Sequence, residues 1–115
     1  MDENLFSRIN FLLKHIDLIE NDLKDRSFEE FASTDLLVRA TAFSLAQIGE
    51  QMNKLSVYLK DKYPEVPWSK AIGMRNIIIH VYNNVDAGQV YFTATNNLKE
   101  LKALFLKIKQ NERYK

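Results

Sequence analysis

The most informative absence in this 115-residue chain is cysteine, of which there is none. Without thiols the chain can form neither a disulfide nor a thiolate metal site. This composition suits a reducing cytosol, and we therefore expect a cytoplasmic protein. Three glycines and two prolines are also few for the length. Their scarcity argues against a disordered chain and against an all-β fold rich in turns.

Long apolar runs and an excess of charge of one sign are missing as well. No run approaches the roughly 20 apolar residues that a membrane-spanning helix requires. The first four residues are acidic and polar, unlike the basic start of a signal peptide, so we expect no membrane association. Because 16 Lys and Arg stand against 15 Asp and Glu, composition alone gives no sign of nucleic-acid binding. Any binding of a polyanion must come from local clustering of charge.

Apolar residues at helical spacing are what the sequence does contain. They make up 46% of the chain, enough for the core of a single domain over residues 1–115. In the first segment they step by three or four positions: Leu5, Ile9, Leu12, Ile16, Ile19 and Leu23. This spacing predicts an amphipathic helix, with Asp2 as its N-cap.

A second helical region follows a clear start signal. Ser27 and Glu30 have the spacing of a capping box, which predicts that a helix begins there. Thr34 or Asp35 offers another start, for a long helical pattern that runs to about Asp61. Small residues lie along that pattern: Ala40, Ser44 and Gly49. They would let a neighbouring helix approach closely.

The strongest break in the chain is at Pro64 and Pro67, because proline disfavours helix at the residue before it. A new helix is predicted from Trp68 to about Tyr82, followed by a turn ending at Asp86, which can cap the last helix. The apolar positions of that last helix are Val90, Ala94, Leu98, Leu101, Phe105 and Ile108. About four main helices with short connections predict an all-α fold, an antiparallel helix bundle.

One predicted helix carries nearly all the residues suited to chemistry. Arg75 offers a permanent, planar positive charge that matches the oxygens of a phosphate. His80 can take or give a proton near neutral pH. Asn76 and Asn83 can hold a ribose or phosphate without adding charge. With no thiol, glycine-rich phosphate loop or metal-binding histidine set in the sequence, we expect metal-independent acid–base chemistry at a phosphodiester, without a cofactor.

These residues also have simpler interpretations. Arg75 and His80 could be a surface ion-pair partner and a structural histidine, and Tyr82 a half-buried residue with a hydrated hydroxyl. Ile72 and Ile79 interrupt the polar face of the same helix. Two aliphatic residues there suggest that another subunit covers this face.

The surroundings of this helix resemble the HepT-like toxins of the HEPN superfamily, across nearly the whole chain. The stretches that carry the resemblance are Ile48-Gly49-Glu50, Val66-Pro67-Trp68, Ile72-Gly73-Met74-Arg75-Asn76, His80-Val81-Tyr82 and Val85-Asp86. The family motif is Arg, four residues, His, one residue and Tyr, and it maps onto Arg75, His80 and Tyr82. At Val81 many members carry an acidic residue instead.

The resemblance implies a four- to five-helix HEPN-like bundle that forms a homodimer with its motif helices close together. It implies a metal-independent ribonuclease toxin, whose partner is a minimal nucleotidyltransferase antitoxin that adenylylates the motif tyrosine, here Tyr82. His80 would then act as acid or base and Arg75 would stabilise the charged phosphorane, while Asn76 and Asn83 position the RNA phosphate. A hypothesis from another class is a non-catalytic, nucleotide-binding partner of a nucleotidyltransferase, an antitoxin-like subunit.

Further polar residues allow two interpretations each. Glu50 could pair with Arg75 or Arg39 across the bundle and orient it, or be an ordinary surface carboxylate. His15, beside Lys14, is expected to be exposed. One face of the last helix carries four basic residues: Lys99, Lys102, Lys109 and Arg113. That stripe could hold an RNA backbone, but the acidic residues nearby favour an ordinary solvated face.

Overall fold

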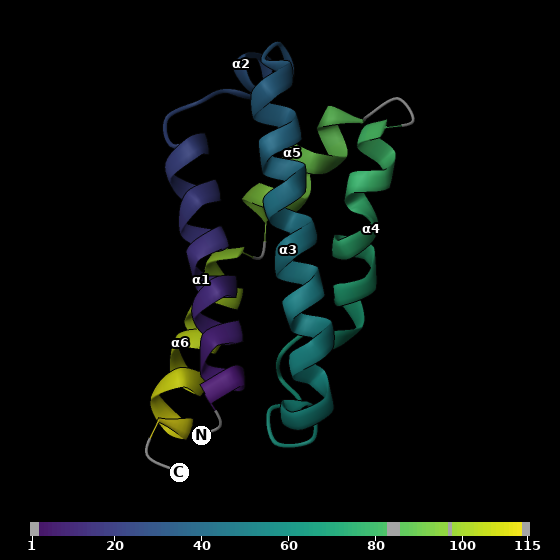
Figure 1. The fold of residues 1–115 in the computed structure, drawn as a ribbon. Coiled ribbons are helices and arrows are strands. Elements are labelled where there is room, and N and C mark those ends of the chain that lie inside the picture. Colours follow the sequence, from purple (N-terminus) through teal and green to yellow (C-terminus); the bar gives the residue numbers. More distant parts are fainter. Residues whose placement is uncertain (1–2, 83–85, 97, 114–115) are drawn as a thin grey trace.

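The computed structural model describes residues 3–82, 86–96 and 98–113, and every regular element within these ranges is a helix. Figure 1 shows an elongated bundle in which neighbouring long helices run antiparallel. The long helices are α1 (Glu3–Leu23), α3 (Asp35–Leu59), α4 (Ala71–Tyr82) and α6 (Leu98–Glu112). The short ones are α2 (Phe28–Ala32) and α5 (Ala87–Thr95). The predicted all-α, HEPN-like bundle is thereby confirmed.

Helix α1 is amphipathic, as its spacing of apolar residues predicts. Ile9, Leu12 and Ile16 are completely buried, and the helix packs against α3 and α6. Burying one such side chain contributes roughly 1.5–3 kcal/mol, so tertiary packing rather than intrinsic propensity holds this helix. Asp2, the predicted N-cap, lies outside the described residues.

The predicted capping box is present at the start of α2. The Ser27 hydroxyl accepts a hydrogen bond from the Glu30 backbone N–H at 3.1 Å, and the Glu30 carboxylate accepts one from the Ser27 backbone N–H at 3.5 Å. Helix α3 then begins at Asp35 and ends at Leu59, close to the predicted bounds. It runs through the middle of the bundle, with α1 on one side and α4 on the other (Figure 1).

Buried aromatic residues hold the proline-containing connection from α3 to α4. The Trp68 indole N–H donates to the Tyr63 carbonyl oxygen at 2.9 Å, and the indole ring meets Phe105 edge-on. The Tyr63 hydroxyl donates to the Glu112 carboxylate at the end of α6, 2.5 Å away. Burial and this hydrogen bond raise the pKa of Tyr63. A 3-10 turn, Trp68–Lys70, leads into α4, so the new helix starts where the sequence predicts.

The final helical pattern differs from the prediction, because the structure divides it into two helices. Asp86 caps α5 as expected, its carboxylate accepting from the Gln89 backbone N–H. The helix ends at Thr95, and the backbone of the next residue, Asn96, is extended (φ −108°, ψ 140°). The Asn96 side-chain amide donates to the Phe92 carbonyl oxygen at 2.9 Å. The Asn96 backbone N–H donates to the same carbonyl at 3.0 Å, so the side chain adds a second hydrogen bond where the extended backbone ends a helix that apolar spacing alone would continue.

Candidate active site

Helix α4 carries the residues that the sequence singles out. Its backbone is helical through Tyr82, so Arg75, His80 and Tyr82 lie on one helix, as predicted. At about 100° per residue, Tyr82 returns to within about 20° of Arg75. The structure describes the side chains of α4 as far as Ile78, and Asn83 lies outside the described residues. The roles of His80, Tyr82 and Asn83 therefore stay predictions.

The described part of α4 has the two faces that a helical wheel predicts. Ile77 is 3% exposed and belongs to the core, and Met74 packs against that core. On the other side Ile72 is 54% exposed, and the side chain of Arg75 is 41% exposed. Asn76 is half-buried beside it. The polar face of α4 thus presents a guanidinium group to solvent, next to an exposed aliphatic side chain.

Gly49 of α3 brings the two helices together at Arg75. A Cβ atom at this glycine would collide with the backbone nitrogen of Arg75 and lie 2.5 Å from the Ala71 carbonyl oxygen and 2.9 Å from the Met74 Cβ. Only a residue without a side chain fits there, so α3 and α4 are in backbone contact at the first turns of α4. The predicted close approach at the small residues is confirmed at Gly49.

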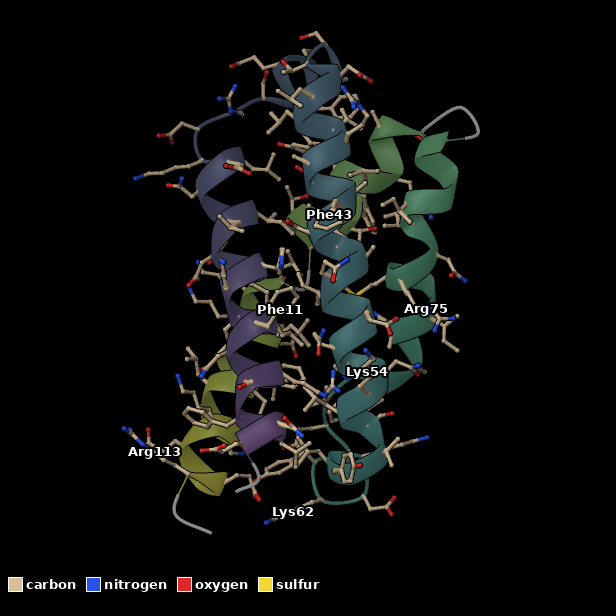
Figure 2. All side chains as sticks on the ribbon, viewed as in Figure 1. Phe11, Phe43, Lys54, Lys62, Arg75 and Arg113 are labelled. Atoms are coloured by element: carbon tan, nitrogen blue, oxygen red, sulfur yellow. The ribbon has the colours of Figure 1, made fainter. Side chains whose placement is uncertain are left out.

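The next residue of α3, Glu50, contacts two cations with its two carboxylate oxygens. Oε2 lies 3.9 Å from Nη1 of Arg75 on α4, and Oε1 lies 3.4 Å from Nζ of Lys54 on α3. Figure 2 shows Lys54 and Arg75 on the same side of the bundle. All three side chains are between 33% and 44% exposed, and such pairs contribute at most about 1 kcal/mol to stability. The contact therefore contributes little to the stability of the fold.

Of the two partners considered for Glu50, the structure selects Arg75. Arg39 pairs instead with Asp35 within the first turn of α3, at 2.9 Å. The sequence interpretation missed Lys54. The signal that could have found it is its spacing from Glu50, four residues along the same helix, where opposite charges meet.

His15 is not exposed, and the expectation from the sequence is wrong. Its side chain is buried between α1 and α3, with Nδ1 3.0 Å from the Ser44 hydroxyl. The rings of Phe11 and Phe43 cover it, with centroids 4.6 and 6.2 Å away. Burial, and secondarily the charge of Lys14, lowers the pKa of His15. The contacts with Phe11 and Phe43 shield the His15 ring from solvent.

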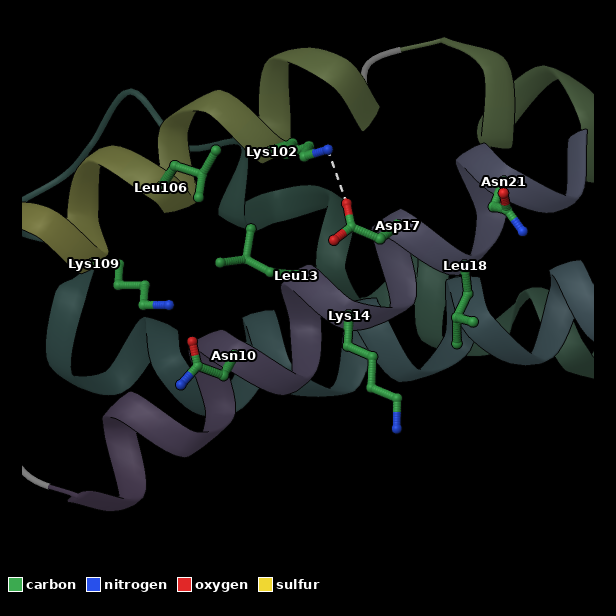
Figure 3. A pocket seen from close by; sticks show the side chains of 9 residues that line it. All are labelled: Asn10, Leu13, Lys14, Asp17, Leu18, Asn21, Lys102, Leu106 and Lys109. Carbon is green, nitrogen blue, oxygen red and sulfur yellow. Dashed lines mark ion pairs between the residues drawn. The ribbon is translucent and has the colours of Figure 1, made fainter. Parts of the chain in front are cut away.

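The basic stripe of α6 lies against acidic residues of α1. Lys102 Nζ is 2.8 Å from an Asp17 carboxylate oxygen and 2.9 Å from one of Glu20. Hydrogen bonds to Asp17 and then Glu20 raise the pKa of Lys102. Lys109 lies over the ring of Phe6. Figure 3 shows the shallow groove between α1 and α6, about 560 Å³ in volume, with the Lys102–Asp17 pair across it.

Among the described residues, no three His, Asp or Glu side chains come together in a way that could hold a metal ion. The same part of the chain contains no helix with the length and apolar character needed to cross a membrane.

Comparison with known proteins identifies a family that spans most of the chain. The family described as "Ribonuclease HepT-like" matches residues 12–108. The protein "Putative RNase MJ0125" of Methanocaldococcus jannaschii is 36% identical over 97 residues, which cover 84% of each chain. "Putative RNase TTE0752" of Caldanaerobacter subterraneus is 30% identical, over 91% of this chain and 94% of the relative.

A further similar protein, "Probable ribonuclease HepT" of Thermococcus cleftensis, is 30% identical over 83% of this chain and 86% of its own length. No solved structure shows a significant match to the chain.

Proposed function

This chain belongs to the HepT-like ribonuclease family, and we propose that it is a metal-independent endoribonuclease toxin in which Arg75 and His80 are catalytic. The observation that carries the proposal is the position of Arg75. Backbone contact at Gly49 fixes its place, Glu50 orients it, and the guanidinium remains open to solvent. An exposed arginine in this position can bind a phosphate with the N–H donors of its guanidinium group.

The reaction begins at the 2′-hydroxyl of the RNA. His80, or its counterpart on a second subunit, removes the hydroxyl proton while the 2′-oxygen forms a bond to the adjacent phosphorus. The bond from phosphorus to the 5′-oxygen breaks, and a protonated histidine returns a proton to the leaving oxygen. The products are a 2′,3′-cyclic phosphate and a free 5′-hydroxyl. Arg75 stabilises the charge that builds on the phosphorane oxygens, which is the role that a metal ion would otherwise fill.

Neighbouring residues position the groups that react. Asn76 follows Arg75 on α4, half-buried, and together with Asn83 it holds the phosphate or ribose. Glu50 sets the direction of the Arg75 side chain. The distance of 3.9 Å between Glu50 Oε2 and Arg75 Nη1 is too long for a hydrogen bond. The guanidinium can therefore turn toward a phosphate without breaking a hydrogen bond to Glu50.

We further propose that the protein acts as a cytoplasmic homodimer. The motif helices of two subunits would lie close together, and the exposed Ile72 supports an interface on this face. A two-fold axis would bring two Arg75 side chains to a single groove.

The partner we propose is a minimal nucleotidyltransferase antitoxin that adenylylates Tyr82. An attached AMP adds a phosphate two helical turns from Arg75, where the guanidinium can hold it. That phosphate would occupy the space of the RNA phosphate and block the site.

The test is incubation of the purified protein with total RNA, beside Arg75→Ala and His80→Ala. Arg39→Ala is the matched control, because Arg39 is also an exposed arginine with a carboxylate partner. We expect cleavage by the wild type and by Arg39→Ala, and loss of cleavage in the other two. If the wild type leaves RNA intact and its expression alone does not arrest growth, the proposal fails. A non-catalytic partner of a nucleotidyltransferase would then account for the chain.

A further inference from the structure

A pocket between the start of α1 and the last turns of α3 adjoins the Arg75 site. Its volume is about 440 Å³. The lining residues are Asn4, Leu5, Arg8, Lys54, Val57 and Tyr58, and we call it the Lys54 pocket. Two of the six are cations and none is acidic. This distinguishes it from the groove between α1 and α6, where Asp17 lies among the lysines.

The side chains of the Lys54 pocket have the chemistry that single-stranded nucleic acid requires. Tyr58 is 68% exposed, so its ring has an open face. Nη1 of Arg8 donates to the buried Gln51 side chain at 3.2 Å, which fixes the guanidinium and leaves its other N–H groups for a ligand. An aromatic ring beside cations is the arrangement on which a base stacks while its phosphate is neutralised.

Lys54 belongs both to the pocket and to the ion pairs at Arg75. Its Nζ contacts one oxygen of Glu50, and the other oxygen of that carboxylate contacts Arg75. One acidic residue therefore stands between two cations, and the local charge stays positive. The ion pairs of Glu50 link the pocket to the Arg75 site, and we infer that successive phosphates of one strand bind at the two places.

We propose that the Lys54 pocket binds a nucleotide of single-stranded RNA next to the phosphodiester at Arg75. Tyr58 stacks on its base, and Arg8 and Lys54 contact its phosphate. This inference rests on the proposed ribonuclease function and adds to it a preference for unpaired RNA, since a base inside a duplex cannot reach the ring of Tyr58. It also predicts that substrate length matters, because a dinucleoside monophosphate has a single phosphate, which cannot lie at Arg75 and at Arg8 and Lys54 at once.

The experiment measures binding of a single-stranded hexanucleotide with 2′-O-methyl groups, which the protein cannot cleave, by fluorescence anisotropy at several salt concentrations. Tyr58→Leu removes the ring and keeps an apolar side chain, and Tyr58→Phe restores the ring. We expect Tyr58→Leu to weaken binding roughly five- to a hundredfold, and Tyr58→Phe to bind within about twofold of wild type. For cleavable RNA the loss should appear in KM and be smaller for a dinucleotide.

Charge is tested with a matched pair of lysine variants. Lys54→Gln should lower the slope of log K against log salt by about 0.7, the value for one phosphate contact in a single strand. Lys107→Gln removes the same charge from an exposed position on α6 and should leave the slope unchanged. Far-UV circular dichroism and urea unfolding show whether each variant keeps the fold.

The outcomes separate this inference from the proposed function. If Arg75-dependent cleavage occurs but Tyr58→Leu binds and cleaves like wild type, the pocket proposal is overturned and the ribonuclease stands. If RNA stays intact while binding depends on Tyr58 and Lys54, the pocket stands and the ribonuclease proposal fails. Equal losses in Lys54→Gln and Lys107→Gln, or no binding at low salt, overturn the pocket.

Discussion

Two of the basic surfaces that the structure describes differ in what surrounds their cations. In the groove between α1 and α6, Lys102 is held by two carboxylates, Asp17 and Glu20. On the face of α3 and α4, the single carboxylate of Glu50 serves two cations, Arg75 and Lys54, at longer distances. At the first surface two carboxylates neutralise the charge of Lys102, whereas at the second surface one carboxylate is shared by two cations and an excess of positive charge remains.

The comparison shows that the number of basic residues in a stripe does not identify a polyanion site. The stripe on α6 is the more conspicuous in the sequence, but a neighbouring helix supplies two counter-ions for its residue Lys102. Arg75 and Lys54 lie far apart in the chain and become one cationic cluster only because Gly49 brings α3 and α4 into contact. The availability of donors to a ligand therefore follows from packing.

The largest expected difference is between two variants, each of which lacks one cation from one of the surfaces. Arg75→Ala should lower kcat for RNA cleavage roughly 100- to 1,000-fold, as for loss of one charge-stabilising donor. Lys102→Ala should change kcat less than about twofold, because its ammonium already binds two carboxylates. Steady-state kinetics on a defined RNA measure both values. Equal losses in the two variants would show that the surfaces do not differ in function.

The next effect concerns the contact that creates the cluster. Gly49→Ala should destabilise the protein by roughly 1–3 kcal/mol. The added Cβ would overlap backbone atoms of α4, which can move away only if the two helices shift apart. It should also lower activity by displacing Arg75. Gly73→Ala on α4 is the control, since a Cβ there has no neighbour within 4 Å. It should be neutral or stabilising by up to about 1 kcal/mol. Urea unfolding that gives the two variants the same stability would contradict this account of the helix contact.

A smaller effect is expected when the counter-ions of the α6 surface are removed. Asp17→Asn combined with Glu20→Gln should release Lys102 and increase non-specific binding of single-stranded RNA at low salt. The slope of log K against log salt should steepen by about 0.7 if one further phosphate is contacted. The rate of cleavage should not rise, because the added contact lies away from Arg75. An unchanged slope in anisotropy titrations would mean that the carboxylates do not restrain this lysine.

The smallest effect is a pH dependence of stability that arises away from the proposed site. Burial lowers the pKa of His15, so the unfolded chain binds a proton more readily than the native one. The stabilisation is complete above the ordinary pKa of about 6.5 and is lost as pH falls toward the lower native value. Urea unfolding at pH 7 and pH 5 should show a decrease that is smaller in His15→Gln. The same decrease in both proteins would assign it to other groups.

The sequence predicted the fold well because each element has a local cause. Periodic apolar residues define α1, the Ser27–Glu30 pair starts α2, and the prolines separate α3 from α4. The break at Asn96 was missed because apolar spacing continues across it, whereas the extended backbone of Asn96 ends α5. The spacing of apolar residues indicates which side of a helix is buried, but it does not indicate the residue at which the helix ends.

The candidate site was only partly predictable for a related reason. The spacing of Arg75, His80 and Tyr82 is visible along the chain, since one helix carries all three. The choice of Arg75 over Arg39 as partner of Glu50, and the burial of His15, depend on which helix packs on which. These are contacts between residues distant in the sequence, and a single sequence contains no direct record of them.

The central claim is that Arg75 and His80 cleave RNA through attack by the 2′-hydroxyl, and the chemistry of the product ends tests it most directly. A purified oligoribonucleotide is incubated with the wild-type protein and the fragments are analysed by mass spectrometry. The account predicts 2′,3′-cyclic phosphate and 5′-hydroxyl ends, and no cleavage at a position where the 2′-hydroxyl is replaced by hydrogen. Fragments with 3′-hydroxyl and 5′-phosphate ends, or cleavage at the deoxy position, would contradict it.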